Sequence, residues 1–233
     1  MTEAPNRALF RFPEQARVGR VLPKARIYEH AGVSGAMRDK FVAEVEQIIW
    51  AYKLAPETLN LRAHADVLEI QVFDIALKGE DVDEDVLRTI DRAIPHPIVF
   101  QVWRGQEFRT VAAFKRRSHA GMDKPVIDGY LSSPWLPHDS ARQPLPISLD
   151  LKGLYEQLLR SLLPLPARHG ETLREQLARL DALRSRQNEY LRLQTRLRRE
   201  RQFNRKVTLN AQLRALKNEI GRLNDPQDEP PAA

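Results

Sequence analysis

Apolar residues repeat with different periods along the chain, and each period predicts a kind of element. Residues 1–22 have no sustained repeat and are predicted to form an irregular N-terminal strap. A proline and a glycine then bracket a short helix over 24–30. Ser34 is placed to cap a second helix, because apolar residues recur every three or four positions over 37–52.

The middle of the chain alternates apolar and polar positions, as half-buried strands do. Residues 67–77 are rich in β-branched and apolar side chains and are predicted to form a strand. Asp81 and Glu84 have capping-box spacing for a helix that ends before Pro95. Further strands are predicted at 98–103, 106–115 and 126–131, with Arg104-Gly105 as a tight turn between the first two.

A last helix over 150–163 has leucines at helical spacing, so it is expected to cover one face of the sheet. These elements predict an α+β fold over residues 23–165, with a small, mainly antiparallel sheet flanked by helices. The stretch LPLPARHG at 163–170 contains two prolines and a glycine, which break helices and indicate a domain boundary.

The remaining chain is predicted to form a long helical arm over residues 166–224, and Thr172 and Glu175 have capping-box spacing for its first helix. Leucines follow a heptad-like pattern at its start and again after Leu209, but residues 198–208 offer only Phe203 and Val207 as large apolar groups. Two structures fit this gap: one straight coiled-coil helix with a stutter, or an antiparallel hairpin that turns back near 199–204. The end of the chain, 225–233, has the composition of a disordered tail.

Positive charge is concentrated in this arm. Residues 171–224 contain fourteen Lys or Arg and six Asp or Glu, a local charge of +8, whereas the whole chain carries +6. Such density favours contact with phosphates, and solubilising flanks of a coiled coil or an acidic protein partner are the alternatives. The predicted binding residues in the arm are Arg196, Arg198, Arg199, Arg201, Arg205 and Lys206.

A second basic group follows the predicted strand over 106–115. Lys115, Arg116 and Arg117 extend the positive surface in one interpretation. In the other, they guard a sheet edge against pairing with another strand, as lysine and arginine often do.

Several classes of function lack support in the sequence. The chain has no cysteine and no stretch of about twenty apolar residues that would span a membrane, so a reducing compartment, the cytoplasm, is expected. Its histidines lack metal-ligand spacing, and no phosphate-binding loop or nucleophile elbow is present. We therefore expect a protein without catalytic residues, metal or cofactor.

A divergent metal-dependent nuclease is the enzymatic alternative. Such an enzyme needs clustered carboxylates to hold magnesium, and Asp66, Glu69 and Asp74 are the candidates in or near a predicted strand. Glu69 and Gln71 share one face of that strand, whereas Asp66 and Asp74 point to the other. The hypothesis therefore requires that these carboxylates converge on a cavity.

Five sequence segments together resemble those of a bacterial family. They are KLAPETLNL, EIQVFDIALK, IDRAIPHPIVFQV, IDGYLSSPW and QFNRKVTLN, which begin at residues 53, 69, 90, 127 and 202. They resemble the domain-of-unknown-function family numbered 4391 over residues 8–224. The resemblance implies a setting beside DNA methyltransferases and helicases in restriction-modification or anti-phage defence loci, and it implies no catalytic residue.

We therefore expect a non-enzymatic accessory protein. Its α+β domain would dock a methyltransferase or helicase component, and its basic arm would contact DNA or a partner helix. A purely structural arm that forms a homodimer through its leucines is the third hypothesis.

Overall fold

The computed structural model describes residues 9–116 and 126–227. The chain divides into two compact units, Met1–Leu163 and Pro164–Ala233. The first unit is α+β and contains a mixed, mostly antiparallel sheet of seven strands, so the sheet is larger than the sequence predicted. None of the helices in the described ranges is long and apolar enough to cross a membrane.

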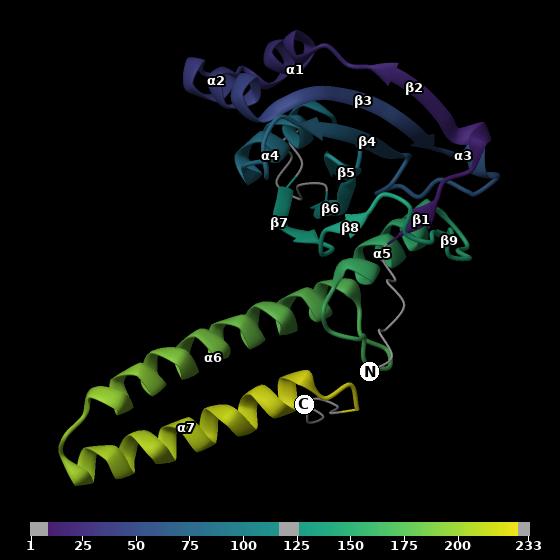
Figure 1. Ribbon diagram of the computed structural model, residues 1–233. Coiled ribbons are helices and arrows are strands. Elements are labelled where there is room, and N and C mark those ends of the chain that lie inside the picture. The colour runs from purple at the N-terminus through teal and green to yellow at the C-terminus, as the bar shows by residue number, and fades with distance from the viewer. Residues whose placement is uncertain (1–8, 117–125, 228–233) are drawn as a thin grey trace. The chain divides into compact units, whose positions relative to one another are not determined.

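The strand order is β2-β3-β4-β5-β6-β7, with β8 paired to β6 (Figure 1). A separate pair joins β1 and β9. The strands are β1 (Phe10–Arg11), β2 (Arg17–Val21), β3 (Val45–Leu54), β4 (Ile70–Leu77), β5 (Ile98–Arg104), β6 (Glu107–Arg116), β7 (Val126–Ser132), β8 (Leu136–Pro137) and β9 (Gln143–Pro144). The first unit's helices are η1 (Glu14–Ala16), α1 (Lys24–Ala31), α2 (Gly35–Glu44), α3 (Pro56–Leu59), α4 (Glu84–Ala93) and α5 (Leu151–Leu162).

Helices α1, α2 and α4 pack on one face of the sheet (Figure 1). Their buried side chains, among them Ile27, Phe41 and Ile90, form one core with Phe73 of β4 and Phe100 of β5. The pair β4 and β5 is parallel because α4 makes the crossover between them. This helix makes the sheet mixed, an exception to the antiparallel pattern that the hairpins create.

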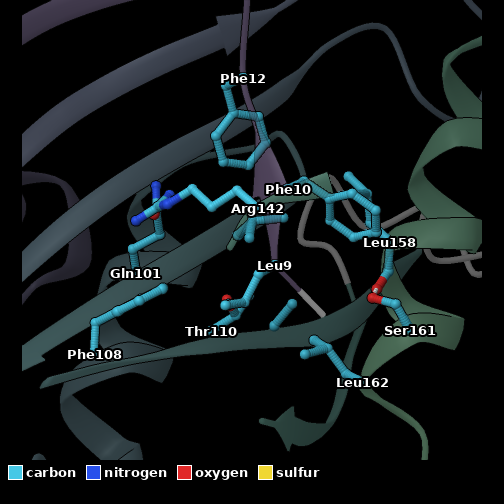
Figure 2. Close-up of a pocket in the computed structure, with 12 residues that line it drawn as sticks. Leu9, Phe10, Phe12, Gln101, Phe108, Thr110, Arg142, Leu158, Ser161 and Leu162 are labelled. Atoms are coloured by element: carbon cyan, nitrogen blue, oxygen red, sulfur yellow. Dashed lines mark hydrogen bonds between the residues drawn. The ribbon is translucent and has the colours of Figure 1, made fainter. Parts of the chain in front are cut away.

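The other face is covered by α5 and by the segment around β1. Tyr155 of α5 donates a hydrogen bond to the carbonyl of Ala113 in β6 at 2.5 Å. Figure 2 shows Leu9 and Phe12 over the same face, beside Arg142, whose Nη1 donates to Oε1 of Gln101 at 2.9 Å. The cavity that they enclose measures about 10 Å³, room for roughly one water molecule, so it is a packing defect and not a ligand site.

The helix predicted over 37–52 is wrong in its second half. Helix α2 ends at Glu44, and Val45–Leu54 forms strand β3 between β2 and β4. Its buried residues recur every third position, at 45, 48, 51 and 54. The cause is two register shifts, after Val45 and after Trp50, each of which adds one residue opposite β4. These bulges turn the two-residue period of a strand into one that resembles a helix.

The N-terminal strap is more regular than predicted. Residues Arg17–Val21 form strand β2, the edge of the sheet, paired with β3. Four of its five residues are exposed, so no apolar alternation marks it in the sequence. Gly19 has φ 64°, a conformation that suits glycine, between the paired residues Arg17 and Arg20, where the register shifts.

Most other predicted elements are confirmed. Gly32 closes α1 in the left-handed conformation, and Ser34 Oγ accepts the N–H of Met37 to cap α2. The cap of α4 is Asp83, two residues beyond the predicted Asp81. Gly105 stands in the turn between β5 and β6, as predicted, although β5 includes Arg104.

The second unit is a helical hairpin, one of the two structures that the sequence left open. Helix α6 spans Leu173–Arg199 and α7 spans Phe203–Asn224, with three residues between them (Figure 1). The two leucine segments pack against each other, and Leu180, Leu183, Leu209, Leu213 and Leu216 are buried. Thr172 and Glu175 form the predicted capping box at the start of α6.

Candidate nucleic-acid interface

The turn of the hairpin is held by Glu200. Its Oε1 accepts the backbone N–H groups of Arg201 and Gln202, each at 2.9 Å, at the start of α7. These bonds lower the pKa of the Glu200 carboxyl, that from Gln202 most, and the charges of Arg205 and Arg196 lower it further. The one carboxylate of the region is thus engaged in turning the chain, in the position where a helix N-terminus favours negative charge.

All six predicted cations of the arm lie at this turn. Each is exposed, and none of them forms an ion pair with a carboxylate in the described part of the chain. They are Arg196, Arg198 and Arg199 at the end of α6, Arg201 in the turn, and Arg205 and Lys206 in the first turn of α7. We call these six residues, with Phe203, the hairpin tip.

Apolar side chains are exposed at and near the hairpin tip. Phe203 is 77% exposed, Val207 54% and Leu191 57%. No residue between 184 and 208 is buried, because the packed leucines lie nearer the base of the hairpin. The tip therefore presents an aromatic ring among guanidinium groups, a combination that suits base stacking beside phosphate contacts.

The base of the hairpin is closed by polar contacts that fix its two ends. Arg179 pairs with Glu171 and donates to the carbonyls of Pro166 at 2.7 Å and Leu223 at 2.8 Å. Arg168 donates to the carbonyl of Arg222 at 2.6 Å. These arginines satisfy carbonyls at the C-terminal end of α7, where cations are favoured. The basic residues of the base are thus engaged within the hairpin, unlike those of the tip.

Lys115 does not belong to an accessible positive surface, which corrects the prediction for this residue. Its side chain is 2% exposed, and Nζ lies 3.3 Å from Oδ1 of Asp91. The ammonium group also donates to the carbonyls of Asp91 and Ile94, each at 2.5 Å, and of His96 at 3.0 Å. Lys115 therefore caps the C-terminal end of α4 from inside the domain.

The two neighbours of Lys115 differ from it. Arg116 is partly exposed and lies 3.6 Å from Oδ2 of Asp128 on β7. This cross-strand pair fits the interpretation of a guarded strand end. Arg117 lies outside the described residues.

The carboxylates of the nuclease hypothesis are engaged separately. Asp66 is exposed and pairs with Lys152 at 3.1 Å. Glu69 pairs with Lys53 and with His96, each at 3.2 Å. Burial raises the pKa of Asp74, and this effect outweighs a hydrogen bond from Trp103 that lowers it. Within residues 9–116 and 126–227, no three His, Asp or Glu side chains are grouped to hold a metal ion, so the nuclease hypothesis lacks the site it requires.

The described structure does contain a groove beside Glu69. Glu69 and Gln71 both line it, which confirms that they share a face of the strand. Trp50 and His96 line it as well, and neither was predicted to lie near Glu69. Trp50 stood in a predicted helix, and His96 is brought near by the crossover through α4, so neither had a local signal.

A family model described as "Domain of unknown function (DUF4391)" matches residues 10–220. The chain belongs to this family. No curated protein and no solved structure matches the chain. The DUF4391 match covers most of both units, from β1 into α7, so the α+β domain and the hairpin with its basic tip are both parts of the family's domain.

Proposed function

We propose that the hairpin tip binds the phosphate backbone of nucleic acid. The observation that carries this proposal is the set of six exposed cations, none of which forms an ion pair with a carboxylate in the described chain. Each phosphate that such a group neutralises releases condensed counterions, which favours binding at moderate salt. Because the cations lie at the turn, the basic ends of both helices can contact the same ligand.

Phe203 supports single-stranded or distorted nucleic acid as the preferred form. Its ring is 77% exposed, and the transfer of an aromatic ring out of water is favourable. Stacking on an unpaired base, or insertion at a deformable base step, would cover it. The six cations would meanwhile hold the backbone on either side.

We place this activity in a non-enzymatic accessory protein of a bacterial restriction-modification or anti-phage defence system, in the cytoplasm. In this account the α+β domain docks a methyltransferase or helicase component, as the family setting suggests. The hairpin tip would then hold the DNA on which that component acts.

The direct experiment measures the affinity of the full-length chain for fluorescent single-stranded and duplex DNA by anisotropy. The test variant R198Q/R199Q/R201Q removes three charges at the tip. The matched control R174Q/R184Q/R214Q removes three exposed arginines elsewhere on the same helices. Both triple variants have the same net charge, so a difference between them reports position and not total charge.

We expect the tip variant to bind at least tenfold more weakly than the wild type. This corresponds to a loss of about 1.4 kcal/mol for three phosphate contacts. The control variant should bind nearly as the wild type does. Equal affinity of the two variants would overturn the proposal, because nonspecific attraction depends on net charge alone.

A partner helix is the second candidate ligand for the hairpin. The observation in its favour is the exposure of Leu191 and Val207, which with Phe203 supply apolar area near the turn. The mass of the full-length chain, measured by light scattering over a range of concentrations, tests the homodimer. A dimer that L191A/F203A/V207A converts to a monomer would favour this candidate over nucleic acid.

A further inference from the structure

The α+β unit contains an open groove of about 540 Å³, within the size range of small-molecule sites. Strand β2 and helix α1 form one wall, and β3, β4 and the end of α4 form the other. The groove lies in the first unit and shares no residue with the hairpin tip. It is therefore a separate feature from the proposed phosphate contact.

The floor of the groove contains two buried polar atoms without a partner. Gln71 is 4% exposed, and its Nε2 donates to Oε1 of Glu69 at 2.5 Å, but its Oε1 accepts no hydrogen bond in the described structure. Nε1 of Trp50 is likewise buried and donates to no described group. Buried polar atoms are rarely left without a partner. The groove is thus lined by two side chains that carry one acceptor and one donor without a described partner.

The carboxylate of Glu69 is held by three neighbouring side chains. Lys53 and His96 each lie 3.2 Å from its carboxylate, and the Gln71 amide donates to it. Glu57 and Glu69 together raise the pKa of Lys53 through hydrogen bonds, that to Glu57 most. Glu69 therefore orients the Gln71 amide and directs Oε1 of Gln71 away from itself.

The opening of the groove is basic and its walls are apolar. Arg20, Arg26 and His30 line it and are exposed, and no ion pair engages them in the described ranges. Phe73 and Ile94 supply apolar wall between this rim and the polar floor. Lys115 positions that wall, because its ammonium group bonds the carbonyls of Ile94 and His96.

We propose that this groove binds a nucleotide, with the base on the floor and the phosphate at the rim. A nucleobase is flat and carries N–H donors beside acceptors on one edge, which matches Oε1 of Gln71 and Nε1–H of Trp50. Both side chains line the groove, but both atoms are covered in the described structure, so the proposal requires that each side chain rotates to present its atom to the ligand. The phosphate would lie against Arg20 and Arg26, which donate charge-assisted hydrogen bonds.

Other ligand classes fit less well. A hydrocarbon would leave both floor atoms unpaired, and a simple carboxylate would bring no donor to Gln71 Oε1. Inorganic phosphate would use the rim and leave the apolar walls uncovered. Only a ligand with a flat polar edge at one end and an anion at the other uses every part of the groove.

The test is titration calorimetry on the full-length chain with AMP, GMP, CMP and UMP. Adenosine and guanosine serve as probes without phosphate, and inorganic phosphate as the probe without a base. R26Q removes a rim charge and Q71L removes the floor acceptor, whereas R92Q changes an exposed arginine of α4 that does not line the groove. Thermal unfolding verifies that each variant is folded. If Q71L does not fold, R26Q still tests the proposal, because Arg26 is exposed and its replacement should not affect folding.

We expect at least one monophosphate to bind, with R26Q about tenfold weaker for that nucleotide and unchanged for its nucleoside, as loss of one charged hydrogen bond predicts. Q71L should weaken both nucleotide and nucleoside by at least that factor, and R92Q neither. The proposal is overturned if no monophosphate binds at millimolar concentration. It is also overturned if phosphate alone binds as tightly as the nucleotides, or if neither R26Q nor Q71L changes the affinity.

A free nucleotide and a nucleotide within a strand share this chemistry, and a trinucleotide separates them. Measured on R198Q/R199Q/R201Q, which removes the contribution of the hairpin tip, a trinucleotide that binds more tightly than the monophosphate identifies a strand as the natural source. Equal or weaker binding identifies the free nucleotide. In both cases the interaction should remain sensitive to R26Q.

Discussion

Arg179 and Glu171 form a two-point ion pair at the base of the hairpin. Nε lies 2.7 Å from Oε1 and Nη2 lies 2.9 Å from Oε2, and the side chains are 6% and 8% exposed. The same guanidinium donates to the carbonyl of Leu223 near the end of α7. One buried arginine thus ties the start of α6 to the end of α7 and holds the two helices antiparallel.

We predict that R179M destabilises the hairpin by about 3–5 kcal/mol, the cost of leaving one member of a buried pair without its partner. All three tryptophans lie in the α+β unit, so tryptophan fluorescence reports that unit alone, whereas circular dichroism at 222 nm reports both. Urea should reduce the helical signal of R179M before the fluorescence changes. R174Q, an exposed change on the same helix, should behave as the wild type; coincident transitions for R179M at the wild-type midpoint would contradict the prediction.

The same pair predicts a loss of hairpin stability in acid. Arg179 lowers the pKa of Glu171 below its ordinary value of 4.5, mainly through the side-chain hydrogen bond. A carboxyl whose pKa is lowered in the folded state contributes its full stabilisation when the pH is above its unfolded pKa. That stabilisation is lost as the pH falls through its folded pKa. The helical unfolding midpoint in urea should therefore fall from pH 5 to pH 3. E171Q should start lower and change less, and parallel curves for both proteins would argue against this role.

Lys115 is predicted to be structural. K115M leaves Asp91 buried without its cation and leaves three carbonyls without a donor, which should cost about 3–5 kcal/mol in the free energy of unfolding. Urea titration followed by tryptophan fluorescence measures it. R116Q removes a partly exposed pair and should cost less than about 1 kcal/mol. A K115M protein as stable as R116Q would return Lys115 to the candidate binding residues.

Phe203 provides a test of stacking that is separate from charge. F203A should leave the free energy of unfolding within about 0.5 kcal/mol of the wild type, because the ring is exposed. Its affinity for single-stranded DNA should fall by about 1–3 kcal/mol, the range for one base stacked on an aromatic ring. L191A removes another exposed apolar side chain of the arm and is expected to leave the affinity unchanged. Equal binding by F203A and the wild type would exclude stacking on this ring.

The sequence predicted those elements whose capping residues and apolar period lie within their own residues. Ser34 and Thr172 cap the helices they were expected to cap. Strand β3 was missed because its bulges depend on how β4 pairs with it, and the sequence of β3 does not contain that information. Strand β2 was missed because an exposed edge strand has little need of apolar alternation.

The candidate sites were predictable to different degrees. The six basic residues of the hairpin tip were visible because they lie close together in the sequence and the leucine pattern stops beside them. Their lack of carboxylate partners depended on the hairpin, and so did the separate engagement of Arg168 and Arg179 at its base. The groove was not predictable, since it joins Trp50, Gln71 and His96 across a bulged strand and a crossover helix.

The salt dependence of DNA binding tests the central claim most directly. For the wild type and duplex DNA, the logarithm of the association constant should fall against the logarithm of salt concentration with a slope of about −5, as six phosphate contacts at about 0.9 each require. R198Q/R199Q/R201Q should reduce the slope by about 2.7, and R174Q/R184Q/R214Q should leave it unchanged. A wild-type affinity that does not vary with salt, or equal slopes for the two triple variants, would contradict the account.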